Sequence, residues 1–217
     1  MIETTGEPFQ DDRRATGRAF TIGASSTEVL EDPEPYRTQF SRAHAIVVRG
    51  CFEPALLDKL LQRCRETSFS VDDANGLGNR EVESPQRVGA ALNLLLGRST
   101  LLGWLEAVTG HRPLVRAAGR LVQARANGAD HLTWHDDHDL PGRKLGMVIS
   151  LCEADYDGGI FEMRRKGTVE PLCTYKHETA GSALIFDIDR TLEHRVTPVT
   201  AGGPRRVYAG WFMQDAG

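Results

Sequence analysis

Two periodicities divide the chain into a helical first part and a strand-rich second part. Before residue 110, apolar side chains recur at helical spacing, and they do so most clearly at Leu56, Leu57, Leu60, Leu61 and Cys64. This spacing predicts an amphipathic helix over about 54–65, and Pro54 suits its first position. A second helical region is predicted over about 88–108, where Gly97 and Ser99 interrupt the pattern and Gly110 ends it.

After Pro113 the pattern changes to short apolar or alternating runs separated by turn signals. The runs cover 120–125, 131–134, 144–151, 159–164, 182–187 and 205–213. The turns between them are rich in Gly, Asn, Asp and Pro. These strands follow one another too closely for helical crossovers, so the sheets should be mainly antiparallel. The prediction is an α+β protein, a two-sheet jelly roll with N-terminal helices packed on one sheet.

Composition along the chain predicts one folded domain behind a polar arm. Residues 1–38 are polar and acid-rich, which predicts a flexible N-terminal arm. The domain is expected over 39–217, with a helical part at about 52–110 and a jelly-roll core at about 114–214. The polar stretch 72–84 is expected to be a surface loop.

Charge and cysteine content exclude several classes of protein. The 217 residues contain 26 Lys and Arg against 30 Asp and Glu, and the net charge of −4 argues against a nucleic-acid-binding role. Neither a membrane-spanning apolar stretch nor a signal-peptide pattern is recognised, so no membrane partner and a cytoplasmic location are expected. The four cysteines form no C-x-x-C pair, and we expect reduced thiols.

The most informative stretch for chemistry is His-Leu-Thr-Trp-His-Asp-Asp-His-Asp, residues 131–139. His131 and His135 are four apart, but the residues between them lack the Glu of a helical zinc protease motif, and their flanks are typical of strands. Residues i and i+2 of a strand share a face, so His135 and Asp137 can bind one metal ion together. A third ligand must come from elsewhere, and His194, just before the last long strand, is the natural candidate.

Two histidines and one carboxylate form the facial triad of non-haem Fe(II) oxygenases, which leaves open coordination positions. A chelating 2-oxo acid placed there needs its distal carboxylate anchored, and a guanidinium fork matches that group. Arg205 begins the last strand run. Alternation predicts that Arg205, Val207, Ala209 and Trp211 share one face and that Arg206 and Tyr208 share the other. Either Arg205 with Trp211 or Arg206 with Tyr208 should therefore face the pocket.

These elements, in this order, resemble the prolyl-4-hydroxylase-like branch of the 2-oxoglutarate/Fe(II)-dependent dioxygenases. The resemblance spans about residues 40–212 and rests on four motifs. They are Cys-Phe-Glu-Pro-Ala-Leu-Leu-Asp-Lys-Leu (51–60), His135-Asp-Asp137, the run 144–151 with Tyr-Asp-Gly-Gly-Ile-Phe (156–161), and His194 followed by Arg205 and Trp211.

The resemblance implies a double-stranded β-helix with Fe(II) held by His135, Asp137 and His194, which would also be the catalytic residues. It implies 2-oxoglutarate bound to Arg205 and dioxygen as the oxidant. Where family members often carry tyrosines, this chain has Arg125 and Ser150. Both are expected to contact the cosubstrate, and Arg125 has an acidic substrate as an alternative partner.

The implied activity is hydroxylation of an unactivated C–H bond, coupled to decarboxylation of 2-oxoglutarate to succinate and CO2. A carboxylate at Asp137 favours hydroxylation over halogenation, since halogenating relatives carry Gly or Ala there. The short chain favours a small-molecule substrate over a protein or peptide side chain. A non-catalytic jelly roll that binds a metal or ligand as a sensor or scaffold, and a cupin-type metalloenzyme, are the alternatives. The sequence leaves the oligomeric state open.

Overall fold

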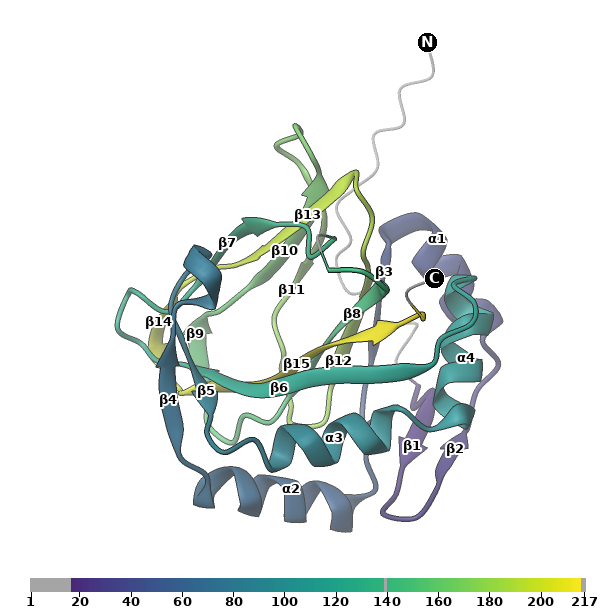
Figure 1. Cartoon of the computed structure of the whole chain (residues 1–217), viewed down its shortest axis with the longest axis horizontal. Helices are drawn as coiled ribbons and strands as arrows, with labels where there is room; N and C mark the ends of the chain where they lie inside the picture. Colours follow the sequence, from purple (N-terminus) through teal and green to yellow (C-terminus); the bar gives the residue numbers. More distant parts are fainter. Residues whose placement is uncertain (1–16, 139, 216–217) are drawn as a thin grey trace.

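Two antiparallel sheets face each other in the computed structural model, which describes residues 17–138 and 140–215 (Figure 1). The larger sheet has the strand order β3 (Ala45–Val48), β12 (Ala183–Asp187), β8 (Arg143–Ser150), β15 (Arg205–Met213), β6 (Arg116–Ala124), β5 (Arg80–Glu83) and β4 (Phe69–Asp72). The smaller sheet has the order β11 (Pro171–Tyr175), β10 (Phe161–Arg165), β13 (Leu192–Val196) and β7 (Leu132–His135). A short ribbon of β9 (Tyr156–Gly158) and β14 (Val199–Gly202) lies beside them.

The inner faces of the two sheets share one hydrophobic core. Val122, Val148 and Val207 come from the larger sheet, and Phe161 and Met163 come from the smaller one. All five are buried because alternating residues of each strand point into the space between the sheets. This arrangement confirms the predicted jelly roll of mainly antiparallel strands.

Helices cover the outer face of the larger sheet, as predicted. They are α1 (Glu34–Ala43), α2 (Pro54–Glu66), α3 (Val88–Leu96) and α4 (Ser99–Thr109). A second core forms between α3, α4 and the outward residues of β6 and β15, which include Leu121, Tyr208 and Phe212. Helix α3 lies close to β6 because Gly89 has no side chain, and a Cβ there would be 3.1 Å from Arg120 Cα.

The first turn of α3 is capped by a buried carboxylate from strand β5. Glu83 is 1% exposed. Its two carboxylate oxygens accept hydrogen bonds from the backbone N–H groups of Arg87, Val88 and Gly89 at 2.7–3.0 Å. These groups have no partner inside the helix, and a negative charge is favourable at a helix N-terminus.

The predicted second helical region is divided as expected into α3 and α4, and Gly110 ends α4 with a left-handed φ of 80°. Among the described residues, no single helix is both long and apolar enough to cross a membrane. Helices α3 and α4 have the necessary length and apolar composition only when taken together, and a 67° bend separates them. All four cysteines are free thiols, as expected.

The structure corrects the expected flexible arm over 1–38 within its described part. Residues 17–38 contain the hairpin β1 (Phe20–Ile22) and β2 (Thr27–Val29) and the start of α1. The rings of Phe20 and Tyr36 pack edge-on against Trp104, with centroids 5.3 and 5.2 Å away. A few well-placed aromatic residues thus hold a segment whose average composition is polar. Residues 1–16 of the expected arm lie outside the described residues.

The stretch 72–84 also differs from the predicted surface loop. Its second half is β5, which pairs with β4 and extends the larger sheet beyond β6. A short 3-10 turn, Ala74–Gly76, joins β4 and β5. Charged residues fit here because this hairpin is the edge of the sheet, where one face and the outer strand border solvent. The hairpin brings Arg80 to the space between the sheets.

Candidate metal centre

The structure brings the three predicted metal ligands together between the two sheets. His135 ends β7 and lies directly opposite His194 on the neighbouring strand β13. One ligand atom from each of His135, Asp137 and His194 lies within 4.8 Å of the others. The 135–137 segment and His194, which are far apart in the sequence, therefore lie side by side in the fold.

Asp137 reaches this point by a different route from the predicted strand alternation. Strand β7 ends at His135, and Asp137 has a left-handed backbone with φ 57°. Among residues other than Gly, Asp and Asn tolerate this conformation best. The backbone turn places the Asp137 carboxylate beside the His194 ring, with Oδ2 3.5 Å from Nε2.

Neighbouring side chains orient the three candidate ligands. The backbone carbonyl of Thr133 lies 2.7 Å from His135 Nδ1, an arrangement in which Nδ1 donates and Nε2 stays free for a metal. Trp211 Nε1 donates to Asp137 Oδ2 at 2.8 Å, and Arg143 Nη1 donates to Oδ1 at 2.8 Å. Such contacts around metal ligands fix their orientation and tune their basicity.

The electrostatics of the site favour the protonation states that a metal requires. Burial first, and then the charge of His194, lower the pKa of His135, which keeps its imidazole neutral. Burial alone would raise the pKa of Asp137, but hydrogen bonds from His194 and Trp211 outweigh it and hold that pKa well below its usual range. A neutral imidazole and an ionised carboxylate are the forms that bind metal ions.

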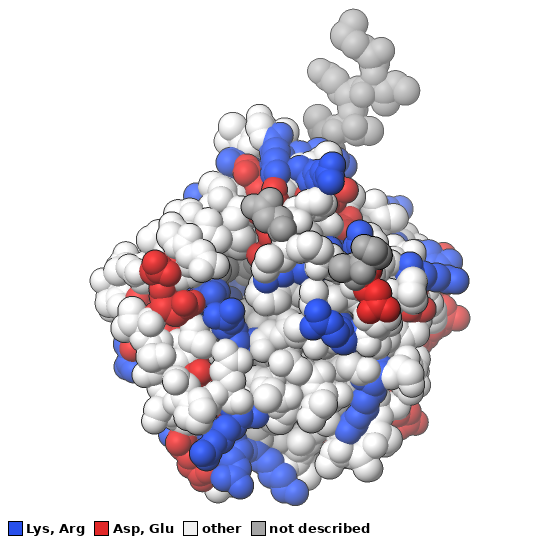
Figure 2. Space-filling view, viewed as in Figure 1, with Lys and Arg blue, Asp and Glu red and all other residues white. Residues whose placement is uncertain are grey.

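A cavity of about 200 Å³ opens beside this cluster. Its walls are mostly apolar and include Val122, Phe161 and Val207, while the three candidate ligands form part of its lining. The inward face of β15 contributes Arg205, Val207, Ala209 and Trp211, as strand alternation predicted. Figure 2 shows blue Lys and Arg side chains around the pale centre of the face seen in Figure 1.

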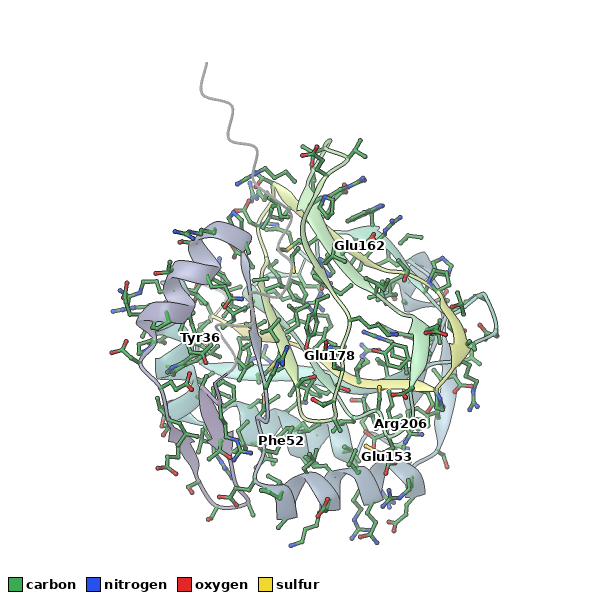
Figure 3. All side chains as sticks on the ribbon, turned by 180° about the vertical axis from the view of Figure 1, so that it is seen from behind. Tyr36, Phe52, Glu153, Glu162, Glu178 and Arg206 are labelled. Carbon is green, nitrogen blue, oxygen red and sulfur yellow. The ribbon has the colours of Figure 1, made fainter. Side chains whose placement is uncertain are left out.

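The structure decides between the two arginines that begin β15. Arg205 lines the cavity and is 5% exposed. Arg206 points to the opposite face of the sheet, where it donates to Gln123 Oε1 at 3.1 Å and lies over the Phe69 ring. In Figure 3 the label of Arg206 lies beside that of Glu153, on the side of the larger sheet that faces α2.

Arg205 is a buried cation without an anionic partner among the described residues. Its Nε has no hydrogen-bond partner, and neither does the nearby hydroxyl of Tyr156. Burial first, and then the charge of Arg205, lower the pKa of His177 to about 3, so this neighbour is neutral. A buried charge is costly unless it is paired, and this guanidinium therefore suits a carboxylate that enters the cavity.

Gly159 makes room for the side chain of Arg205. A Cβ on Gly159 would lie 2.6 Å from Arg205 Cδ and 3.0 Å from the Tyr156 ring. Gly159 also has a left-handed φ of 59°. The Asp-Gly-Gly turn is therefore required both by its backbone and by the close approach of the arginine.

The structure brings neither Arg125 nor Ser150 into the cavity lining, so the expected cosubstrate contacts are not supported. Arg125 is exposed, and its Nε donates to the Glu81 carboxylate at 3.0 Å. Ser150 is 1% exposed on the inward face of β8, one alternation beyond Val148. Its hydroxyl oxygen lies 3.4 Å from the Cys152 backbone nitrogen, which donates to it.

Sequence reasoning missed three arginines that line the cavity, namely Arg80, Arg120 and Arg143. Alternation along β6 could have found Arg120, because it shares a face with Val122 and Ala124. Arg80 was missed because residues 72–84 were expected to form a surface loop, whereas Arg80 begins strand β5. Arg143 had no local signal, since its role depends on contacts with Asp137 and Trp211, which are distant in the sequence or across a turn.

The residues present fit both Fe(II) and a 2-oxo acid. Two imidazoles and one carboxylate are the donor set of the facial triad. Arg205, whose buried Nε has no hydrogen-bond partner, lines the same cavity as the three candidate ligands. The three candidate ligands and Arg205, which were predicted to act together, line one cavity.

Comparison with known proteins supports the same chemistry. Residues 122–213 match the family model of the 2OG-Fe(II) oxygenase superfamily. This range contains all three candidate metal ligands and Arg205. Among curated protein sequences, none matches the chain.

Solved structures of such oxygenases share the fold. A 2OG-Fe(II) oxygenase family oxidoreductase from Burkholderia pseudomallei has 17% identity and a TM-score of 0.65, over 86% of this chain and 93% of that one. A Pseudomonas putida prolyl-4-hydroxylase has 18% identity and a TM-score of 0.63, over 85% and 100%.

A third structure is a Trichoplax adhaerens prolyl hydroxylase in complex with a peptide fragment of a hypoxia inducible factor. It has 14% identity and a TM-score of 0.60, over 83% of this chain and 88% of that chain. The shared fold, the matched region and the His-Asp-His cluster agree with one another. Residues 122–213 are therefore similar to the 2OG-Fe(II) oxygenase superfamily, and the chain shares its fold with solved oxygenases of that kind.

Proposed function

We propose that this protein hydroxylates an unactivated C–H bond of a small-molecule substrate and converts 2-oxoglutarate to succinate and CO2. His135, Asp137 and His194 would hold the iron, and Arg205 would bind the distal carboxylate of 2-oxoglutarate. The observation that carries this proposal is the convergence of the three ligand atoms within 4.8 Å in a cavity that also holds the unpartnered Arg205.

The chain's own residues have separate tasks in this reaction. Arg205 orients 2-oxoglutarate by a charge-assisted hydrogen bond at the buried end of the cavity. Trp211 and Arg143 hold the Asp137 carboxylate in place. The apolar walls formed by Val122, Phe161 and Val207 exclude water from the reacting groups. When bound, Fe(II) supplies the activation of dioxygen, which is the cofactor's contribution to the chemistry.

The size of the cavity supports a compact substrate. Its volume of about 200 Å³ lies below the range of about 300–1,000 Å³ typical of pockets for drug-sized ligands. The same cavity must also hold 2-oxoglutarate, which leaves limited room for the group to be oxidised. A free metabolite or its derivative suits this space better than a folded protein surface.

The test begins with anaerobic addition of Fe(II) and 2-oxoglutarate. We expect a weak visible absorption band, followed by slow succinate formation when air is admitted. Asp137→Ala and His194→Ala should each remove the band and reduce succinate formation by at least about 100-fold, because each removes a ligand. His138→Ala is the matched control, since His138 interacts with Arg190 outside the ligand cluster. A metal-loaded protein that binds no 2-oxoglutarate would favour the non-catalytic jelly roll.

A further inference from the structure

Four arginines and two aspartates line the cavity, which gives it an excess of positive charge. The arginines are Arg80, Arg120, Arg143 and Arg205, and the aspartates are Asp130 and Asp137. Under the proposed function, Fe(II) adds two positive charges and 2-oxoglutarate adds two negative charges. The loaded cavity thus keeps the same excess of cations, and part of it is available to a substrate.

The partners of these arginines show which ones are satisfied. Arg205 would be used by 2-oxoglutarate. Arg80 Nε donates to the Asp72 carboxylate at 2.9 Å. The same Asp72 oxygen is the nearest anion to Arg120, and its distance of 3.9 Å from Nη1 is too long for a hydrogen bond. One carboxylate therefore serves two guanidinium groups, and Arg120 is the poorly paired one.

Arg120 cannot be explained by 2-oxoglutarate. Both carboxylates of that molecule are already engaged in the proposed function, one at the iron and one at Arg205. Arg205 lies opposite Ala124 in the sheet, and Arg120 lies four residues further along β6. At a rise of about 3.3 Å per residue, the two arginines start about 13 Å apart. The Arg120 side chain is also 38% exposed, which places it toward the solvent side of the cavity.

Arg143 completes this group beside the iron ligands. Its guanidinium stacks over the Trp211 ring with 3.4 Å between the guanidinium carbon and the ring centroid, and Nη1 donates to Asp137. Arg120 and Arg143 line the same cavity from β6 and β8, the two strands on either side of β15, where they lie opposite Ala209 and Met213. A guanidinium has five N–H donors, and an anion between the two groups would use those that remain.

We propose that the substrate carries a carboxylate that binds between Arg120 and Arg143, which places a neighbouring C–H bond beside the iron ligands. This inference rests on the proposed oxygenase function and adds the chemical class of the substrate. A carboxylate matches the N–H donors of guanidinium groups, and its charge would balance two such cations in one cavity. It also identifies Arg120 as a residue that determines specificity.

The test uses propionate and propionamide, which have nearly the same shape and differ in charge. Each is titrated into the anaerobic protein loaded with Fe(II) and 2-oxoglutarate, and binding is followed by calorimetry and by perturbation of the visible band. We expect propionate to bind at least about tenfold more tightly than propionamide. Arg120→Gln should remove this difference while leaving the affinity for 2-oxoglutarate within twofold. Arg206→Gln, on the other face of the same sheet, is the matched control and should change neither value.

Equal binding of the two probes would overturn the inference, and so would propionate binding only when 2-oxoglutarate is absent, because the anion would then be using Arg205. Failure of 2-oxoglutarate to bind at all is a different result, since it refutes the oxygenase proposal. In that case the titration of the metal-loaded protein, compared with its Arg120→Gln variant, still decides whether the second anion site exists.

Discussion

Replacing Arg205 with alanine removes the proposed anchor of 2-oxoglutarate and leaves the iron ligands in place. Arg205 is 5% exposed, its Nε has no hydrogen-bond partner, and it forms no ion pair with the acidic side chains that the structure describes. The Nε–H of Arg205 is therefore free to bind a ligand. Because the anchor would contact the distal carboxylate only, Arg205→Ala should weaken cosubstrate binding more than it slows turnover at saturation.

The magnitude follows from the kind of contact that is lost. A hydrogen bond to a charged group is worth about 1.5–3 kcal/mol, and a buried ligand carboxylate without its partner belongs near the upper part of that range. At about 1.4 kcal/mol for each factor of ten, the expected rise in the KM for 2-oxoglutarate is about 10-fold to 150-fold. Arg205→Lys should show a smaller rise, since it keeps the charge and loses the planar fork.

The assay measures succinate formation over a range of 2-oxoglutarate concentrations, with anaerobic titration of the visible band as a direct measure of binding. Arg206→Ala is the control, because Arg206 is one residue away and lies on the opposite face of β15. An unchanged KM in Arg205→Ala would refute the assignment of this residue. An equal rise in both variants would show that the effect comes from a disturbed strand and not from a lost anchor.

Two further changes test the surroundings of the site, and a third tests the Asp187 carboxylate, which is bonded to His44 and His111. Gly159→Ala would place a Cβ 2.6 Å from Arg205 Cδ at a left-handed backbone position, so the KM for 2-oxoglutarate should rise while Fe(II) affinity is retained, and an unchanged KM would contradict the packing argument. Trp211→Phe removes the donor to Asp137 Oδ2 and should weaken Fe(II) binding by about 10-fold or more in a metal titration, whereas equal affinity would mean that the contact does not orient the ligand. Asp187 is 14% exposed, and although burial raises its pKa, hydrogen bonds from His111 and His44 lower it to about 2. Because the folded pKa lies below the unfolded value, its stabilisation is present above about pH 4 and is lost as the pH falls toward 2. Asp187→Asn should therefore reduce the unfolding free energy by about 2 kcal/mol at pH 7 and by less at pH 3 in urea titrations, and a pH-independent difference would refute this explanation.

The local sequence pattern was sufficient to predict site residues that lie on a single strand or within a single motif. The alternation of β15 predicted that Arg205, Val207, Ala209 and Trp211 line one surface, and the structure confirms it. His194 was the natural third ligand for the 135–137 motif from its place before the last long strand, the family resemblance implied the same residue, and β7 and β13 do lie side by side. Long-range pairing of this kind needs either a family pattern or the structure.

Other parts of the site depend on tertiary contacts that no local pattern contains. Asp137 was expected to follow a straight strand, but its strand ends at His135 and a left-handed turn brings the carboxylate into place. Arg143 belongs to the site because it contacts Asp137 and Trp211, and Trp211 lies on another strand, β15. Arg125 was expected to contact the cosubstrate. In the structure it pairs with Glu81 on strand β5 and is not part of the cavity lining.

The carboxylate of Glu83 restricts where this fold can change its substrate preference. It anchors the start of α3 to the same strand, β5, whose first residue, Arg80, borders the cavity. A sequence change that shifts β5 would therefore disturb the helix that covers the opposite face of the sheet. The turn at 73–79 is held by its backbone, since the carbonyls of Leu77 and Asn79 accept hydrogen bonds from Thr133 and His131, while Asn75, Leu77 and Asn79 also line the cavity. Divergence in substrate choice among close relatives should consequently accumulate in that turn, while the strand after it stays fixed.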